Sequence, residues 1–149
     1  MKPPRILPPG IFLIFVLAMW ALHLIVPIKK LFSHPYNYIG VFFIVDGLTL
    51  VLWSAKIFSE NATTIKPHER SSVLIKHGPY QMTRNPIYLG MTGMLLGVGM
   101  VFGTPLALAL PFIFARIITQ QFIIPEEDRL EKDFGDDYRE YKARVRRWL

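Results

Sequence analysis

The sequence contains no cysteine among its 149 residues. Disulfides, thiolate nucleophiles and cysteine-ligated metal sites are therefore excluded, while the redox compartment stays open. The chain has four histidines, but none has the spacing of a metal site, so we predict no metal. Internal repeats and low-complexity segments are also missing, and the length is that of a single domain spanning residues 1–149.

Charged residues are scarce, at 19% of the chain, whereas 52% of the residues are hydrophobic. The apolar residues form long blocks, and the basic residues behind the net charge of +6 flank those blocks. This arrangement is typical of charges that orient a membrane protein near anionic headgroups. Because no basic stripe with interleaved aromatic residues forms a base-stacking platform, we expect no nucleic-acid partner.

Four apolar blocks approach the roughly 20 residues that cross the hydrocarbon of a bilayer. They cover residues 11–28, 39–58, 87–102 and 105–124. In lipid a helix satisfies its own backbone polar groups, so the predicted fold is an all-α integral membrane protein with about four transmembrane helices. Gly103-Thr104-Pro105 predicts a tight hairpin between the last two blocks. A loop (59–86) and a tail (125–149) complete the chain.

The basic residues predict the orientation of the chain. With the N-terminus inside, only Lys29 and Lys30 lie outside, and Arg116 lies within a span. The positive-inside rule therefore predicts that both termini are cytoplasmic. The loop and the tail then share one membrane face, where they can build one site. In the tail, aromatic and apolar residues recur at helical spacing, which predicts amphipathic helices separated at Gly135.

Two polar motifs stand at the ends of apolar blocks. Arg84-Asn85-Pro86 precedes the third block, where a snorkelling arginine, an N-cap and a first-turn proline give a structural explanation. Glu126 and Glu127 follow the fourth block, and acidic residues favour the first turn of a helix. Alternatively, a carboxylate at the membrane edge can hold a cation, such as an ammonium or a sulfonium.

Polar or small residues inside the spans leave alternatives open. Intramembrane ionisable groups are functional candidates, and Asp46 and Arg116 either pair with each other or line a substrate cleft. Gly93 and Gly97 form a small-xxx-small pair, which is typical of a close helix contact. A groove that admits a ligand is the alternative explanation for these glycines.

Several short motifs occur in a recognisable order. They are Gly78-Pro79-Tyr80, Arg84-Asn85-Pro86-Ile87-Tyr88-Leu89-Gly90, Glu126-Glu127, and Phe134-Gly135 with Tyr138 and Tyr141. From about residue 63 to residue 148 this set resembles the isoprenylcysteine carboxyl methyltransferase and phospholipid N-methyltransferase superfamily. The resemblance implies an integral membrane enzyme that transfers a methyl group from S-adenosylmethionine to a lipophilic or membrane-borne acceptor at the cytoplasmic face.

Carried over by position, the resemblance implies three sets of residues. The catalytic set is Arg84, Asn85 and Tyr88. The cofactor-binding set is Ser72, Val73, Leu74, Ile75, Gly78, Tyr80, Asn85, Pro86, Ile87, Tyr88, Glu126 and Glu127. The acceptor-binding set is Asp46, Arg116 and Phe122.

The chain departs from the superfamily pattern at two positions. Asn85 replaces the usual histidine, and an asparagine forms hydrogen bonds but takes up no proton near neutral pH. Phe122 stands where prenylcysteine enzymes carry a substrate-contacting arginine, which disfavours a prenylcysteine acceptor. Two other functions stay open: a nicotinamide-dependent membrane reductase related to the superfamily, and a non-catalytic membrane scaffold. The sequence leaves the acceptor and the oligomeric state undetermined.

Overall fold

The computed structural model describes residues 6–26, 29–31, 34–61 and 73–149, and throughout these residues the regular structure is helical. The main helices are α1 (Pro8–Ile25), α2 (Ile39–Glu60), α3 (Pro86–Phe102), α4 (Pro105–Ile118), α5 (Ile124–Phe134) and α6 (Asp136–Arg144). The short elements are the 3-10 turns η1 (Tyr36–Tyr38) and η2 (Gly78–Gln81) and the π-helical turn η3 (Thr119–Ile123).

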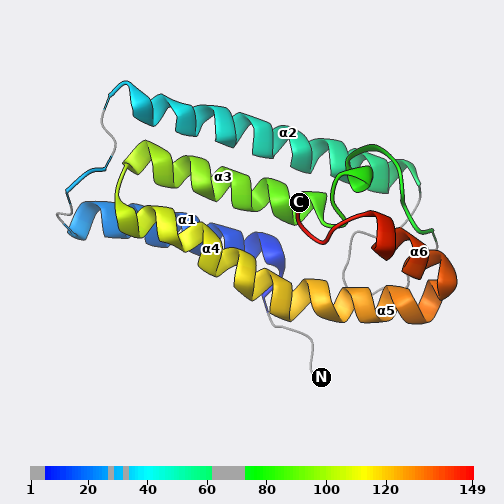
Figure 1. Cartoon of the computed structure of the whole chain (residues 1–149). Coiled ribbons are helices and arrows are strands. Elements are labelled where there is room, and N and C mark those ends of the chain that lie inside the picture. Colours follow the sequence, from blue (N-terminus) through cyan, green and yellow to red (C-terminus); the bar gives the residue numbers. More distant parts are fainter. Residues whose placement is uncertain (1–5, 27–28, 32–33, 62–72) are drawn as a thin grey trace.

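The predicted class of all-α integral membrane protein is confirmed. In the described part of the chain, α1, α2 and the helix that runs from Pro105 to Phe134 are long and apolar enough to cross a membrane. The apolar helix α3 is shorter and lies between α2 and α4 (Figure 1). Large apolar side chains such as Leu17 and Phe112 remain exposed on the outer faces, which suits contact with lipid.

The helices extend clearly beyond the predicted spans at the start of the first span and at the end of the fourth. The first helix begins at Pro8 and not at residue 11. The fourth helix does not end at residue 124, because the π-helical turn η3 joins α4 to α5 without a break. Pro125 lies in the first turn of α5, where a missing backbone N–H costs little. The expected helix ends at Gly103 and Gly135 are confirmed, and both glycines have positive φ.

Four glycines bring the backbones of α2 and α3 into direct contact. A Cβ at Gly40 would lie 2.3 Å from the carbonyl oxygen of Gly97, and one at Gly47 would lie 2.5 Å from that of Gly90. We call these four residues the glycine interface. The close helix contact predicted for the third span is thus confirmed at Gly97, and α2 fills the face on which a ligand groove was the alternative. Gly93 takes little part, since its added Cβ would meet nothing nearer than 3.9 Å.

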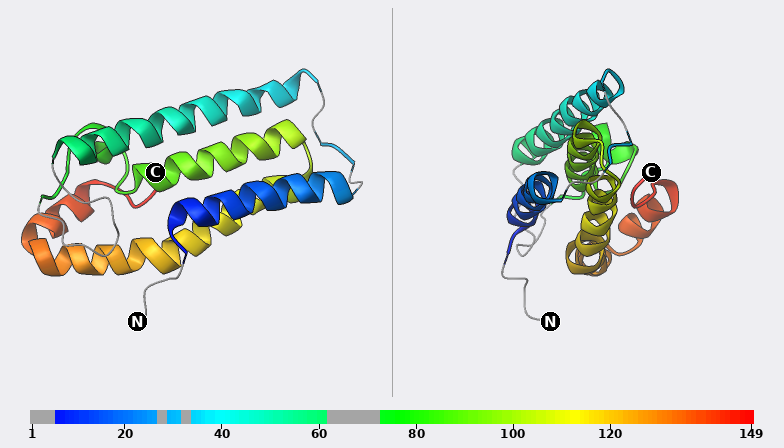
Figure 2. Two further views of the ribbon diagram at one scale, coloured as in Figure 1. Left: turned by 180° about the vertical axis from the view of Figure 1, so that it is seen from behind. Right: turned by 90° about the vertical axis from the view of Figure 1, so that its left-hand side faces the viewer.

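The four long helices place all the candidate motifs at one end of the molecule. From behind, α1 lies alongside α4 (Figure 2), and it also contacts α3. Their shared apolar core includes Met19, Leu95, Phe114 and Ile118. The η2 turn, the start of α3, and the helices α5 and α6 gather at the end opposite Gly103 (Figure 1). The loop and the tail therefore meet at one end, as the sequence predicted.

Candidate functional site

A buried ionic network joins the start of α3 to α5 and to the C-terminal residues. The Arg84 guanidinium donates to Oε1 of Glu127 at 2.7 Å, and Nη2 of Arg147 donates to Oε2 of Glu127 at 2.7 Å. We call Arg84, Glu127 and Arg147 the ionic network. The side chains of Arg84 and Glu127 are only 8% and 7% exposed. Arg84 is therefore not a snorkelling arginine, and Glu127 is not a solvated first-turn acid.

The 145–149 segment, whose end is marked C in Figure 1, lies across the start of α3. The backbone N–H of Arg84 donates to the carbonyl of Arg146 at 3.0 Å. The carbonyl of Arg147 accepts from the Thr83 hydroxyl at 3.0 Å and from the Asn85 side-chain amide at 2.9 Å. Asn85 is the N-cap residue of α3, as predicted, but its side chain makes no cap hydrogen bond. Its amide instead holds the 145–149 segment.

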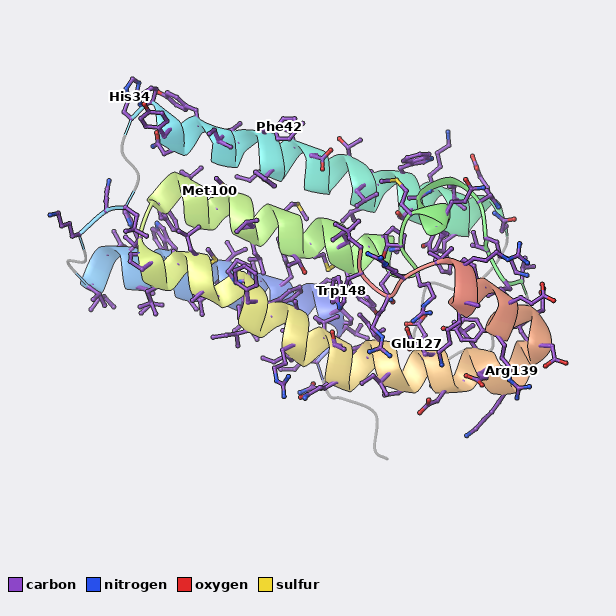
Figure 3. The ribbon with its side chains drawn as sticks, in the orientation of Figure 1. His34, Phe42, Met100, Glu127, Arg139 and Trp148 are labelled. Atoms are coloured by element: carbon purple, nitrogen blue, oxygen red, sulfur yellow. The ribbon has the colours of Figure 1, made fainter. Side chains whose placement is uncertain are left out.

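Hydrogen bonds and the charges of two arginines favour the ionised form of Glu127. Burial alone raises its pKa, but the hydrogen bond from Arg147 and the charge of Arg84 outweigh burial, so the pKa lies below the usual glutamate value. Figure 3 shows Glu127 on the side of α5 that faces α6 and the C-terminal segment. Trp148 adds a link on the same segment, because its indole N–H donates to the Thr119 hydroxyl at 3.2 Å.

Glu126 has the opposite electrostatic character. Burial raises its pKa to about 7, although Arg129 opposes the rise, and the adjacent Glu127 adds to it. Its charge acts on Tyr80 and Tyr88, which lie within Coulombic range. The two neighbouring carboxylates therefore point into different surroundings, as successive positions of a helix do. Glu126 is left without a strong cationic partner from the ionic network.

Tyr80 belongs to the η2 turn and packs against the end of α2. It packs with Ile57 and Ile75 in a small apolar cluster, and its backbone carbonyl accepts from the Tyr141 hydroxyl at 2.6 Å. Burial, with Glu126 contributing, raises the pKa of the Tyr80 phenol above its ordinary value. The Tyr80 hydroxyl is buried without a hydrogen-bond partner among the described residues. A buried polar group of this kind is costly unless a ligand or water satisfies it.

The other residues of the cofactor set lie around this cluster or next to it in the chain. Ser72 lies outside the described residues. Val73 is exposed, whereas Leu74 is half-buried and Ile75 is buried against Ile57. Gly78 has φ 62 and sits over the end of α2, where an added Cβ would lie 2.6 Å from Cδ1 of Ile57. Pro86 is buried, and Ile87 and Tyr88 are half-buried at the start of α3.

The three residues of the acceptor set are not brought together. Phe122 is buried in the shared apolar core. Asp46 and Arg116 are exposed on α2 and α4, which lie on either side of α3 (Figure 1). No ion pair joins Asp46 to Arg116 in the described chain, so of the two alternatives left open for these residues the mutual pair is not formed there.

Sequence reasoning missed the contribution of the C-terminal segment. Arg147, Thr83 and Trp148 were not candidates, yet each links α3 or α4 to this segment or to Glu127. In the sequence Arg147 is one basic residue among seven in the tail, a pattern that indicates headgroup contact. The only local signal was the continuation of apolar and aromatic spacing to Trp148, which predicted that the tail is ordered.

Comparisons with known proteins identify the family of the chain. The family model described as phospholipid methyltransferase matches residues 36–137, which include α2, α3, α4, α5 and the η2 turn. An uncharacterized protein of Haemophilus influenzae is 44% identical over 63 residues, which make up 42% of this chain and the whole of that relative. No solved structure matches the chain. Since the family model covers more than half of the residues, the chain belongs to the phospholipid methyltransferase family.

Proposed function

We propose that this protein transfers a methyl group from S-adenosylmethionine to a lipophilic acceptor that reaches it from the bilayer. Membership of a phospholipid methyltransferase family supports membrane methyltransferase activity. The single observation that carries the proposal further is the buried, unpartnered hydroxyl of Tyr80, which we place in one cluster with Glu126 and Tyr88 because the charge of Glu126 acts on both phenols. This cluster combines a carboxylate, phenols and apolar walls at one end of the spans.

The cluster has the donors and acceptors that the cofactor requires. Glu126 offers a carboxylate for an ammonium or a sulfonium, and it needs such a cation because burial disfavours its charge. The unpartnered hydroxyl of Tyr80 offers a hydrogen bond to a polar group of the same ligand. The backbone from Val73 to Gly78 and the half-buried Ile87 and Tyr88 supply further walls. These residues fit S-adenosylmethionine.

When bound, S-adenosylmethionine supplies an electrophilic methyl group on a cationic sulfur. The acceptor needs proximity and a dry environment, because the positive charge disperses as the methyl group moves. The apolar side chains of the spans provide such an environment for a lipid. Asn85 takes up no proton near neutral pH, so in this proposal it positions the chain through the carbonyl of Arg147 and does not act as a base.

In this proposal Arg84 and Glu127 position the site and do not contact the acceptor. Besides Glu127, Arg84 donates to the carbonyls of Lys142 and Val145 at 3.1 Å and 3.3 Å. One guanidinium therefore ties the turn before α3 to α5, α6 and the C-terminal segment. We place this end of the molecule in the cytoplasm, where the cofactor is available, on the strength of the basic residues in the loop and the tail.

Ligand binding to Glu126→Ala tests the cofactor assignment. We expect the parent protein in detergent or nanodiscs to bind S-adenosylmethionine by calorimetry and to bind no NADPH. The variant should elute as a folded protein and lose most of its affinity for S-adenosylmethionine. Binding of NADPH instead would favour a reductase, and binding of neither would favour a scaffold. A variant with the affinity of the parent would show that Glu126 is not part of the site.

Methyl transfer itself is tested with radiolabelled S-adenosylmethionine and a membrane lipid extract. We expect label in the lipid fraction, and mass spectrometry of the labelled lipid then identifies the acceptor. Defined vesicles with or without an aminophospholipid distinguish a headgroup amine from other acceptors. Absence of label from all lipids, in a preparation that binds the cofactor, would contradict a lipid acceptor.

A further inference from the structure

Two ionisable side chains that are not part of the cluster of Glu126, Tyr80 and Tyr88 are exposed on the membrane-spanning helices. Asp46 lies on α2 and Arg116 on α4, and both are exposed. Neither has an ion-pair or hydrogen-bond partner in the part of the chain that the structure describes. Charged groups at this depth normally pair or face a bundle interior, since hydrocarbon solvates them poorly. Their partners must therefore come from outside one copy of the chain.

Helix packing places Asp46 and Arg116 at the same depth. Gly47, next to Asp46, packs against Gly90 of α3, and on the other side of α3 Ala107 packs against Gly99. Along α4, Arg116 comes nine residues after Ala107. Along α3, Gly90 comes the same number of residues before Gly99. Because α3 and α4 are antiparallel (Figure 1), Arg116 also lies at the level of Gly90.

Asp46 and Arg116 do not reach each other within one molecule. The helix α3 separates α2 from α4 (Figure 1), and its glycine interface keeps α2 on one side of it. One small ligand, such as a zwitterionic headgroup, would have to extend across α3 to contact both side chains. A second copy of the chain carries the same two charges at the same depth. Asp46 on α2 is therefore complementary to Arg116 on α4 of that copy, and Arg116 is complementary to its Asp46.

We propose that a second copy of this chain covers these flanks in a dimer with a two-fold axis along the membrane normal. In this proposal Asp46 of one protomer pairs with Arg116 of its partner and the reverse pair forms at the same time, which is geometrically consistent because such an axis preserves depth. The helices α2 and α4 both run antiparallel to α3, so the contacting helices are parallel in this dimer.

A second polar pair supports the same contact. Thr49 on α2 and Gln120 in η3 are exposed, and each lies about one turn beyond its charged neighbour, toward the same end. The Thr49 hydroxyl donates within its own helix to the carbonyl of Val45 at 2.8 Å, which leaves its oxygen free to accept. Gln120 carries the donors that such an oxygen accepts from, and hydrogen bonds of this kind stabilise helix contacts in lipid.

Charge exchange between differently tagged chains tests the dimer. Both tags on parent chains should co-purify from nanodiscs or mild detergent. Asp46→Arg alone, or Arg116→Asp alone, places like charges together and should lower the co-purified fraction by roughly tenfold or more. Co-expression of Asp46→Arg chains with Arg116→Asp chains should restore it, because the mixed dimer contains both opposite-charge pairs. This rescue also shows that each variant chain folds.

A cross-link in native membranes gives a second measurement. The chain has no cysteine, so a bis-maleimide links only engineered positions. Asp46→Cys chains mixed with Arg116→Cys chains should form a linked dimer, whereas Leu24→Cys, exposed on α1, should not link to either. Three results would overturn the proposal: a monomeric parent in bilayers, co-purification that single charge reversals leave unchanged, or a mixed pair without recovery.

Discussion

Between α2 and α3, four glycines bring two backbones into contact, whereas at the start of α3 three charged side chains bind one another through directed bonds. The glycine interface depends on the absence of side-chain atoms, with approaches of 2.3–2.5 Å for any added Cβ. The ionic network depends on charge, with contacts of 2.7 Å around Glu127. The first contact sets where the helices lie, and the second sets how the candidate site is assembled on them.

This difference separates changes that unfold the molecule from changes that alter its site. A shape contact between backbones cannot relax around an added atom, so one methyl group pushes two helices apart. An ionic contact responds to protonation and to the loss of a partner, while the helices beneath it stay in place. The following predictions test this separation.

The largest effect is expected from Gly90→Val. Its Cβ would lie 2.5 Å from the carbonyl oxygen of Gly47, and neither backbone can move without separating the pair. We expect no stably folded protein, measured as loss of a monodisperse peak on size exclusion. Gly93→Ala is the matched control on the same helix, and we expect it to change the stability by less than about 1 kcal/mol. A stable Gly90→Val protein would show that shape does not dominate this contact.

A smaller loss is expected from Glu127→Gln. The change removes one partner from a buried pair and should lower the free energy of unfolding by about 3 kcal/mol, measured by denaturant titration in detergent. Because the pKa of Glu127 is lowered by folding, its contribution is present above the ordinary pKa of about 4.3 and is lost as the pH falls through the lower folded value. Arg144→Gln, which breaks an exposed pair with Glu140, is the control and should cost under about 1 kcal/mol. Equal losses of unfolding free energy for the two variants would contradict the claim that the buried Glu127 contacts stabilise the protein more than an exposed ion pair.

The smallest effect concerns Glu126 and pH. Its pKa of about 7 means that it is mostly protonated at pH 6 and mostly ionised at pH 8. If the ionised carboxylate holds the cofactor, affinity for S-adenosylmethionine should weaken by about tenfold from pH 8 to pH 6, as calorimetry can measure. The amine of the cofactor also titrates, and it affects the parent and the variant equally. Glu126→Gln should therefore lose only the part of the pH dependence of affinity that arises from the Glu126 carboxylate. If affinity for S-adenosylmethionine depended on pH equally in parent and variant, Glu126 would not be the carboxylate that binds the cofactor.

The fold follows from the sequence because lipid leaves the backbone few choices. The uncharged stretch between residues 87 and 115 and the glycine at residue 103 predicted the hairpin of α3 and α4. The sequence did not show that the helix continues past residue 124, because a proline in a first helical turn allows the helix to continue. Gly40 and Gly47 carried no signal of their own, since seven-residue spacing does not form a small-xxx-small pair. Only the partner helix reveals their role.

The candidate site was predictable where it rests on ordered motifs, and not where it rests on distant contacts. Glu126 and Tyr88 stood out because each motif is local. Arg147 did not, because the contact with Glu127 joins parts of the chain that no periodicity connects. The same reason explains why the sequence left two alternatives open for Asp46 and Arg116, because it does not reveal that α3 separates their helices.

The contact of the 145–149 segment with the start of α3 has a consequence for the timing of assembly. Ribosomes make the chain from its N-terminus, so α2 and α3 can associate in the bilayer while residues 145–148 are still unmade. The donors at Thr83, Arg84 and Asn85 form their hydrogen bonds to residues 146 and 147 only after most of the tail has been synthesised. Helix insertion and completion of the candidate site are therefore separate events in biosynthesis, and nascent chains halted before residue 145 should insert normally without the hydrogen bonds that residues 146 and 147 accept from Thr83, Arg84 and Asn85.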